Sequence, residues 1–502
     1  MRENSQAQVP MTFPRVMLLT ALVAFAFQGS RGLFDSTEGR YAECARQTME
    51  QGNLWEPVLN GEHHWTKPPL TYMVIASGYK VLGVNEWGAR TGHALALIAT
   101  TALVYTAGNL MWPGSGIYAS LAYGLAVFPV GASHALSTDA FLVFFQSAAI
   151  AAYWAAVRKQ KSVWIIAMWV AFGGGFMTKG PVVFLMFLPV ATAHILFRRQ
   201  GKPVPMLLNP IGLIAFAVTG LTWYGLMIHK YPELLGYWVL HETIGRNLYG
   251  EFNRNPEWYK PLTVYGPVLL LGGIPWTLPL IPMIRRAFKA FPDKKAMFRA
   301  GFVTPERGFL TGGVLFPVII LSLATSRLAL YVLPVQVILS LAAGRGLQLL
   351  TDSSPAWLPR LRTMALVTAV VFIAAKGIAA WVPAGNDMRS LSINLKPLLS
   401  EWPEHDLYVL RHTSLYGLQF YLKGDPVPQV ELEDAQKILQ RARDTGRVQL
   451  VLMRTRTLKK LEGYIDQRIY RVMPVNHSWT MIVIDRQTLQ EKPDEQRSVP
   501  DH

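Results

Sequence analysis

Long apolar runs separated by short polar stretches dominate the first 382 residues of the chain. Runs of about 17 to 25 apolar residues are long enough for a helix to cross the hydrocarbon core of a bilayer. Beyond this point charged and apolar positions alternate or mix, as in a soluble domain. The pattern therefore predicts a polytopic α-helical transmembrane domain over residues 1–382 and a separate domain over residues 383–502.

The C-terminal domain has the pattern of a mixed α/β fold. Three short β-branched and apolar runs, at residues 406–410, 448–453 and 479–485, predict strands. Residues 434–445 have apolar positions at helical spacing. We find neither a phosphate-binding loop nor a catalytic triad in this region, so its sequence does not indicate what the domain does.

Charge fixes the orientation of the transmembrane domain. The densest basic loops lie at residues 158–161, 198–202 and 285–299, and short Lys/Arg-rich loops stay in the cytoplasm. Counting spans in both directions along the chain from these cytoplasmic loops, we predict about eleven spans, an odd number. The N-terminus then lies in the cytoplasm and the C-terminal domain outside. The predicted spans are 16–27, 90–111, 116–134, 139–157, 163–178, 181–197, 207–228, 262–284, 309–325, 328–349 and 361–382.

Two N-terminal segments decide whether the number of spans is odd. Residues 16–27 resemble the apolar part of a signal peptide, but no convincing cleavage site follows, so we interpret them as an uncleaved first span. Residues 69–83 are short, begin with a proline pair and are rich in Tyr and Lys, which favours an element in the membrane interface. A full span there would put the N-terminal arginines outside, against the positive-inside rule.

Composition supports the membrane assignment. The chain is 51% hydrophobic and 16% charged, against about 25% charged residues in soluble domains. Its net charge of +16 lies largely in the predicted cytoplasmic loops. This placement indicates that the positive charge sets the membrane topology and contacts anionic lipids, rather than binding nucleic acid. Cys44 is the only cysteine, which excludes an internal disulfide and a multi-cysteine metal site.

A dense charged cluster, LFDSTEGRYAECARQ, follows the first apolar run. It places Asp35, Glu38, Arg40 and Tyr41 at the outer membrane surface. Considered alone, the cluster is equally well explained as an interfacial helix with a capped start and a solvated face. The alternative is the centre of an active site.

Other polar residues arrive on the same predicted face, and each also has a structural explanation. Lys67, in HHWTKPPL, can extend from a Pro-stiffened turn to the headgroups, and Asp139 is well placed to cap a helix. Lys179, between two apolar runs, needs a counter-charge. The remaining candidates are His241 and Glu242 in the long loop 229–261, Arg327 at a span end, and Tyr331 one turn further on.

Together these residues predict an extracytoplasmic chamber formed by the outer loops 29–89 and 229–261. Several cations in such a chamber suit a substrate that is itself a membrane-embedded anion, such as a lipid-linked phosphate. A carboxylate would act on the acceptor as a general base or orient it.

A family resemblance rests on motifs in a fixed order. DSTEGRYAE, TKPPL, GVNEWGARTG, STDAFLVFF, TKGP, HETIGR…NPEWYKPL and SRLALYVLPV follow one another over roughly residues 15–350. In this order they resemble the bacterial branch of the dolichyl-phosphate-mannose protein mannosyltransferase superfamily, and most closely the lipid A aminoarabinose transferases. The resemblance implies a GT-C fold and an inverting glycosyltransferase, a hexosyl- or pentosyltransferase, that uses a polyprenyl-phosphate sugar.

The resemblance also implies roles for individual residues. Where the family frequently has Asp three positions before the Arg of its first outer loop, this chain has Thr37, so either Asp35 or Glu38 is the implied catalytic carboxylate. Asp139 matches a second acidic position. The family often has Glu before Lys-Pro-Pro, where this chain has Thr66, which weakens any metal site with His241. The implied donor-binding residues are Arg40, Tyr41, Lys67, Lys179, His241, Arg327 and Tyr331.

We therefore predict a multi-pass enzyme of the bacterial inner membrane, with its C-terminal domain in the periplasm. Its partners would be a polyprenyl-phosphate (undecaprenyl-phosphate) sugar donor, membrane lipids, and lipid A, another envelope glycan or a protein as acceptor. No cofactor is required, although a divalent metal near His241 is an alternative. A transporter or flippase of a lipid-linked anion is the rival hypothesis, but the chain lacks the repeated halves that such transporters often show.

Overall fold

The computed structural model describes most of the chain, and its contacts divide the chain into two units. The helical unit comprises Met1–Gln28, Gln51–Pro57 and His63–Ala379, and the mixed unit comprises Gly29–Glu50, Val58–Glu62 and Ala380–His502. Residues 243–253, within the long loop 229–261, lie outside the described part. The described residues are 11–242, 254–290, 293, 295, 299–382, 384–412, 414–424 and 426–485.

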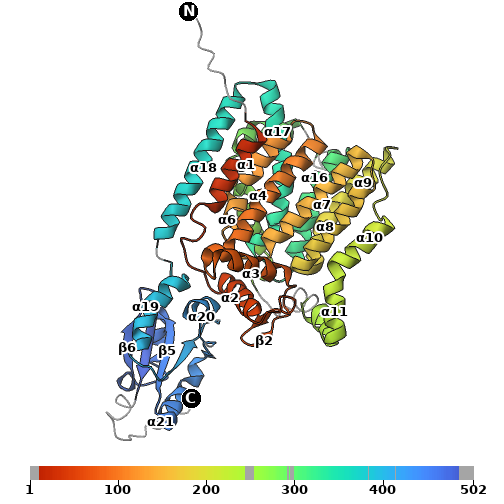
Figure 1. Cartoon of the computed structure of the whole chain (residues 1–502). Coiled ribbons are helices and arrows are strands. Elements are labelled where there is room, and N and C mark those ends of the chain that lie inside the picture. Colours follow the sequence, from red (N-terminus) through yellow and green to blue (C-terminus); the bar gives the residue numbers. More distant parts are fainter. Residues whose placement is uncertain are drawn as a thin grey trace, which may run out of the picture. The chain divides into compact units, whose positions relative to one another are not determined.

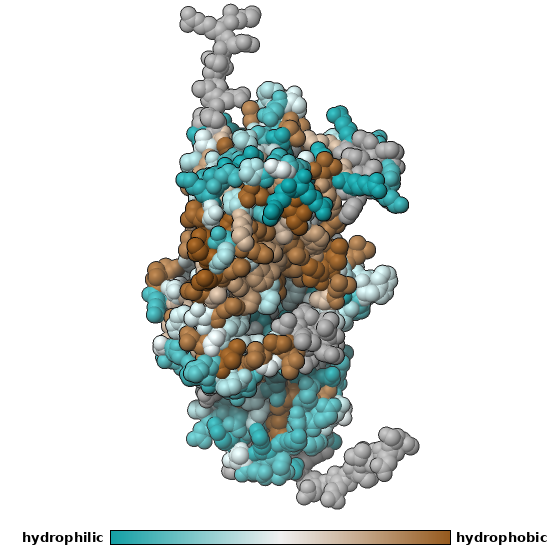
Figure 2. Space-filling view, turned by 90° about the vertical axis from the view of Figure 1, so that its right-hand side faces the viewer, coloured by the Kyte–Doolittle hydropathy of each residue, from teal (hydrophilic) through white to brown (hydrophobic). Residues whose placement is uncertain are grey.

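The helical unit confirms a polytopic membrane protein. Among the described residues, seven helical segments are long and apolar enough to cross a membrane, with mean hydropathy of 1.4 to 2.0. Figure 2 shows the corresponding hydrophobic band across the helices. The count of eleven spans stays a prediction. The seven segments are α4 (Glu86–Met111), α7 (Asp139–Lys159), Val163–Arg199, Pro210–Lys230, α16 (Pro305–Leu323), Ala329–Ser353 and α18 (Trp357–Trp381).

Shorter or broken helices occupy the other predicted spans. The first is α1 (Phe13–Phe25), and the predicted interfacial element 69–83 is the 13-residue apolar helix α3 (Leu70–Leu82). The predicted span 116–134 is divided into α5 (Gly116–Gly124) and α6 (Val127–Ala132). The region of span 262–284 is divided into η4 (Pro261–Tyr265), α13 (Gly266–Leu271), η5 (Leu278–Leu280) and α14 (Ile281–Ala290).

The segment Val163–Arg199 reverses direction at Gly180. It consists of α8 (Val163–Lys179), the 3₁₀ helix η1 (Gly180–Met186) and α9 (Phe187–Arg199), and α7 and α8 lie side by side in Figure 1. Gln146 in α7 donates to the Val183 carbonyl in η1 at 3.0 Å.

Further along both helices, the rings of Tyr153 in α7 and His194 in α9 lie 6.4 Å apart. α7 and α9 therefore run in the same direction. α8 follows α7 after a tight turn and runs in the opposite direction. Gly180 has φ +67°, a conformation that favours glycine at the reversal. Lys179 consequently lies at the same end of the helices as Asp139.

The mixed unit is built on a five-stranded sheet in the order β4-β3-β5-β7-β6. β3 runs parallel to β4 and β5, and β7 runs antiparallel to β5 and β6. Three strands and one helix agree with the sequence prediction, whereas β4, β6, α19 and α20 were not predicted. The elements are β3 (His405–Leu410), β4 (Gln429–Val430), β5 (Val448–Arg454), β6 (Arg471–Pro474), β7 (Trp479–Ile484), α19 (Met388–Ser400), α20 (Tyr416–Leu422), α21 (Ala435–Thr445) and α22 (Leu458–Leu461).

Both faces of the central strand β5 (Val448–Arg454) are buried. On β5, Val451 and Met453 pack into one apolar cluster with α21, and Leu450 and Leu452 pack into a second cluster with α19 and α20. Alternate residues of a strand point to opposite faces, so a continuous apolar strand requires a cover on each side. The helices provide these two covers.

The segment 29–50 belongs to the mixed unit by its contacts. It contains α2 (Thr37–Glu50), and its Phe34 forms an isolated β-bridge with Asp387. The sequence analysis assigns this segment to residues 1–382, and that domain assignment stays a prediction. The short hairpin of β1 (Val58–Leu59) and β2 (Glu62–His63) follows α2.

Candidate active site

Lys179 and Asp139 form an ion pair at one end of the helical unit. The Lys179 Nζ lies 2.6 Å from the Asp139 Oδ1, and both side chains are largely buried. Lys179 Nζ also lies 4.3 Å from the centre of the Tyr331 ring. Asp139 begins α7, Lys179 ends α8, and Tyr331 lies in the 3₁₀ helix η6 (Ala329–Val332), so three separate elements bring these residues together. Their predicted convergence is therefore observed.

Lys67 is paired with a different carboxylate, Glu242. Its Nζ lies 3.1 Å from the Glu242 Oε2, and only 17% of the Lys67 side chain and 10% of the Glu242 side chain are exposed. The turn before Lys67 is ordered by the His64 N–H, which donates to the Pro57 carbonyl. Thr66 contacts the His64 ring through its hydroxyl at 2.7 Å.

An aromatic cluster connects the surroundings of the two lysines. Trp65, two residues before Lys67, packs in the same cluster as Met177, two residues before Lys179. The Trp238 indole N–H donates to the Trp65 carbonyl at 2.9 Å, which fixes the turn against residues that lead to Glu242. The cluster thus supports both ion pairs from one apolar body. Its other members are Leu70, Trp223, Tyr224, Met227, Tyr231, Leu234 and Tyr237.

His241 stacks on an aromatic ring. Its ring centre lies 5.2 Å from that of Tyr237, with 21° between the planes. Within the described residues, no group of three or more His, Cys, Asp or Glu side chains is arranged to hold a metal ion. The donor-binding role of His241, and the alternative of a metal near it, stay predictions.

Arg327 binds backbone carbonyls. Its guanidinium donates to the carbonyl oxygens of Ser322, Asn255 and Glu257 at 2.8 to 3.3 Å, and the residue is 6% exposed. The Asn255 amide donates in return to the Arg327 carbonyl. These bonds join residues 255–257 to the end of α16. A phosphate-binding role for Arg327 stays a prediction.

Asp35 lies in the mixed unit, where one of its carboxylate oxygens is held by a backbone N–H. Its Oδ1 accepts from the Gly417 N–H at 3.0 Å, and its buried Oδ2 has no hydrogen-bond partner among the described residues. Burial raises the pKa of Asp35 from 3.8 to about 7, and the nearby Glu38 adds to the rise, whereas the Gly417 and Leu418 N–H groups and Arg454 oppose it. Asp35 can therefore exchange a proton near neutral pH.

Glu38 is occupied by neighbours in its own segment. Both carboxylate oxygens accept from Arg31, at 2.6 and 2.8 Å, and Oε2 also accepts from the Phe34 N–H. The residue is 5% exposed. Two hydrogen bonds from Arg31 and one from the Phe34 N–H occupy most of the hydrogen-bonding capacity of the Glu38 carboxylate. These bonds close a tight turn at the start of α2.

Arg40 and Tyr41, also in α2, lie close together. The Arg40 guanidinium is 5.8 Å from the centre of the Tyr41 ring, and Tyr41 is buried. The structure thus divides the predicted residues between the two units: Asp35, Glu38, Arg40 and Tyr41 lie in the mixed unit, and the remaining candidates lie in the helical unit.

The sequence analysis missed the partners of the predicted residues. Glu242 was considered only with His241, and neither Arg31 nor Gly417 was considered. For Lys67 a general signal existed, since a cation among apolar runs needs a nearby counter-charge. Nothing in the local pattern, however, selects a residue 175 positions away.

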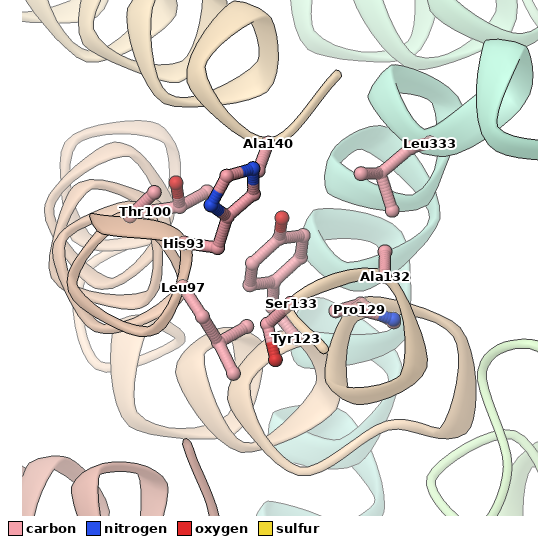
Figure 3. Close-up of a pocket in the computed structure, with 10 residues that line it drawn as sticks. His93, Leu97, Thr100, Tyr123, Pro129, Ala132, Ser133, Ala140 and Leu333 are labelled. Carbon is pink, nitrogen blue, oxygen red and sulfur yellow. The ribbon is translucent and has the colours of Figure 1, made fainter. Parts of the chain in front are cut away.

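A small pocket lies between α4, α5, α6, α7 and the start of α17 (Leu333–Ser353), and none of the predicted site residues lines it (Figure 3). His93, Thr100, Tyr123 and Ser133 contribute its polar atoms, and His93 Nε2 lies 3.1 Å from the Ser137 N–H. We interpret it as a packing defect between polar core residues.

Comparisons with known proteins confirm the resemblance seen in the sequence. The family described as dolichyl-phosphate-mannose-protein mannosyltransferase matches residues 16–237. A relative from Pseudomonas fluorescens strain Pf0-1, undecaprenyl phosphate-alpha-4-amino-4-deoxy-L-arabinose arabinosyl transferase 2, is 27% identical over 64% of this chain and 56% of its own. The corresponding transferase of Yersinia enterocolitica is 28% identical over 64% of this chain and 57% of its own. The match thus spans a little over half the length of these relatives.

The comparison of structures confirms the fold. The crystal structure of ArnT from Cupriavidus metallidurans bound to undecaprenyl phosphate superposes with a TM-score of 0.69, covering 94% of this chain and 98% of that chain at 18% identity. An archaeal oligosaccharyltransferase from Archaeoglobus fulgidus has a TM-score of 0.50 at 10% identity. The protein is therefore a polytopic membrane protein with the GT-C fold and a C-terminal mixed α/β domain.

Proposed function

We propose that this protein is an inverting glycosyltransferase that moves a sugar from a polyprenyl phosphate to an acceptor on the periplasmic face of the bacterial inner membrane. The names of its relatives support a pentose derivative on undecaprenyl phosphate as the donor. In this orientation the N-terminus lies in the cytoplasm and the C-terminal domain in the periplasm.

One observation carries the proposal: buried lysines lie at the end of an apolar helical unit, each paired with a carboxylate. Lys179 has Asp139 and the face of Tyr331, and Lys67 has Glu242. A lipid phosphate would meet these cations where its hydrocarbon chain meets the helices. The lysines would stabilise the negative charge that develops on the phosphate as it leaves.

The chemistry is a displacement at the anomeric carbon. An acceptor oxygen attacks that carbon, the bond from the carbon to the phosphate oxygen breaks, and polyprenyl phosphate leaves with the electron pair. If the acceptor is a hydroxyl group, Asp35 accepts its proton, which suits a carboxyl with a pKa of about 7. If the acceptor is a phosphate, which is already anionic, Asp35 orients it.

The other carboxylates and cations are assigned by their contacts. Glu38 is the second choice as base, because Arg31 already binds both of its oxygens. Asp139 keeps Lys179 in position. We assign donor binding to Lys67, Lys179 and Tyr331, with Arg40, Tyr41, His241 and Arg327 as further donor-binding residues, and we propose that no cofactor is required.

Lipid A is the first acceptor to test, followed by other envelope glycans and by protein hydroxyl groups. A transporter of a lipid-linked anion is not favoured, because the relatives found are transferases.

The proposal is tested with the full-length protein in lipid nanodiscs and a radiolabelled polyprenyl-phosphate aminoarabinose or pentose donor. Lys67→Ala should lower kcat/KM by about 10- to 100-fold, since it removes a charged contact to the phosphate. Lys80→Ala is the matched control, because Lys80 is an exposed lysine of α3. Wild-type transfer by the Lys67 variant would refute the phosphate site, and movement of intact donor across vesicles without transfer would favour the transporter.

A further inference from the structure

Within the mixed unit, the segment that carries the predicted catalytic cluster is bound to the C-terminal residues through its backbone. Besides the Phe34–Asp387 bridge, the Met388 N–H donates to the Leu33 carbonyl at 3.0 Å, and the Asp35 N–H donates to the Asn386 carbonyl at 3.3 Å. Backbone bonds of this kind fix the path of the segment independently of its side chains.

Asp387 fastens two elements at once. Its Oδ2 accepts from the Gly32 N–H at 3.0 Å, and its Oδ1 accepts from the Ser390 N–H at 3.0 Å, which caps the N-terminus of α19. The Tyr421 hydroxyl in α20 binds the Leu33 N–H at 2.9 Å. The chain before Asp35 is thereby held from both α19 and α20.

Two glycines allow α2 and α20 to touch through their backbones. A Cβ at Gly39 would lie 2.3 Å from the Gly417 nitrogen and 2.6 Å from its Cα, distances at which atoms overlap. A Cβ at Gly417 would lie 3.2 Å from the Asp35 Oδ1 and 2.8 Å from a Met388 side-chain carbon. The close crossing is what lets the Gly417 N–H reach Asp35.

Asp35 shows what this packing achieves. The Gly417 N–H occupies Oδ1, while Oδ2 has no partner among the described residues. A carboxylate with one oxygen held by a backbone N–H has a defined orientation, which a proton acceptor requires.

We infer that the C-terminal part of the mixed unit is a positioning component of the transferase: Gly417 orients the Asp35 carboxylate, and Asp387 anchors the segment that carries it. The inference rests on the proposed function, because orientation of Asp35 matters only if Asp35 acts on the acceptor. It gives residues 380–485 a role in turnover.

The test compares Asp387→Ala and Gly417→Ala with two controls in the same unit. Asp434→Ala removes a carboxylate that accepts the Glu431 N–H, far along the sequence from Asp387. Gly463→Ala is a glycine control, since a Cβ there would meet only the Lys460 carbonyl at 3.6 Å. All variants are made in the full chain and assayed in nanodiscs with the labelled donor.

We expect both test variants to lower kcat by about tenfold or more, because small displacements of a reacting group are costly, with the donor KM within about twofold of wild type. In Gly417→Ala the pH midpoint of kcat should also rise. The Gly417 N–H bond favours the ionised Asp35 carboxylate, so its loss raises the pKa of Asp35. A purely structural defect would lower the active fraction without moving this midpoint. Both controls should retain wild-type values.

Hydrogen exchange of the α2 amides provides a readout that does not depend on sugar transfer. We expect Asp387→Ala to speed exchange over residues 37–50 by about tenfold or more, as expected for an element that has lost its anchors. Unchanged exchange, or faster exchange with a wild-type kcat and pH midpoint, would overturn the inference. A wild-type protein that transfers no sugar would refute the proposed function, while the exchange comparison would still decide whether Asp387 anchors the segment.

Discussion

Asp139 and Asp35 are the same residue type in two units, and their surroundings give them different chemistry. Asp139 has an ammonium group 2.6 Å away, that of Lys179. Asp35 receives a backbone N–H, and its burial raises its pKa to about 7. A carboxylate paired with a lysine suits a fixed charge, whereas a buried carboxylate with a raised pKa suits proton transfer. The contrast is between a carboxylate paired with a lysine in the helical unit and a buried carboxylate with a raised pKa in the mixed unit.

Breaking the Lys179–Asp139 pair should have the largest effect. Lys179→Ala leaves a buried carboxylate without its cation, which costs about 3–5 kcal/mol of stability, and it should abolish measurable transfer. Thermal unfolding and kcat/KM are the measurements. The double variant Asp139→Ala/Lys179→Ala should recover stability but not transfer. Recovery of transfer by the double variant would show that the pair is only structural.

Asp35→Asn should have the second-largest effect, and its pH dependence is diagnostic. With a pKa of about 7, Asp35 is protonated at lower pH and cannot accept a proton, so wild-type kcat/KM with a hydroxyl acceptor should rise up to about pH 7 and then level off. The variant should lose about 10²- to 10⁴-fold in kcat and show no such rise. Asp139→Asn serves as the comparison, since its residual activity should keep the wild-type midpoint. A rise through pH 7 that persists in Asp35→Asn would assign the titration to another group.

The smallest effect should come from Glu242→Gln, which keeps the side-chain shape but removes the charge beside Lys67. A donor phosphate would no longer compete with a carboxylate for that lysine, so the donor KM should fall by about two- to fivefold, the size of a partly solvated ion pair. The measurement is donor KM at fixed pH and ionic strength. A large rise in KM would instead mean that Glu242 holds Lys67 in its binding position.

The sequence predicted much of the fold because the relevant signals are local. Apolar runs defined the helices, and the break at Lys179–Gly180 marked a reversal that the structure shows. Assigning the loops to alternate sides of the membrane, starting from the basic ones, predicted that Asp139, Lys179 and Tyr331 lie at the same end of the helices, and they do. Strands β3, β5 and β7 were found because their apolar runs are long, whereas β4 has two residues and β6 four, too few for a periodic pattern.

The hydrogen-bond and ion-pair partners of the predicted site residues could not be predicted from the sequence in the same way. Lys67 takes Glu242 from 175 positions away, and Asp35 takes the Gly417 N–H from 382 positions away. Arg327 donates to three backbone carbonyls, and nothing in its local sequence indicates which ones. Carbonyls and backbone N–H groups occur at almost every residue, so a sequence cannot show which of them a side chain will meet.

By itself, the sequence determined that this chain forms membrane helices, that Asp139 and Lys179 lie at the same end of them, and that a mixed α/β domain follows. These properties depend on hydrophobic burial and on charge at the membrane surface, which act through composition and periodicity. Only the tertiary structure decided which carboxylate each lysine binds, and that segment 29–50 packs with the C-terminal residues. Those outcomes depend on backbone contacts such as that of Gly39 with Gly417, which exist only once distant segments are packed together.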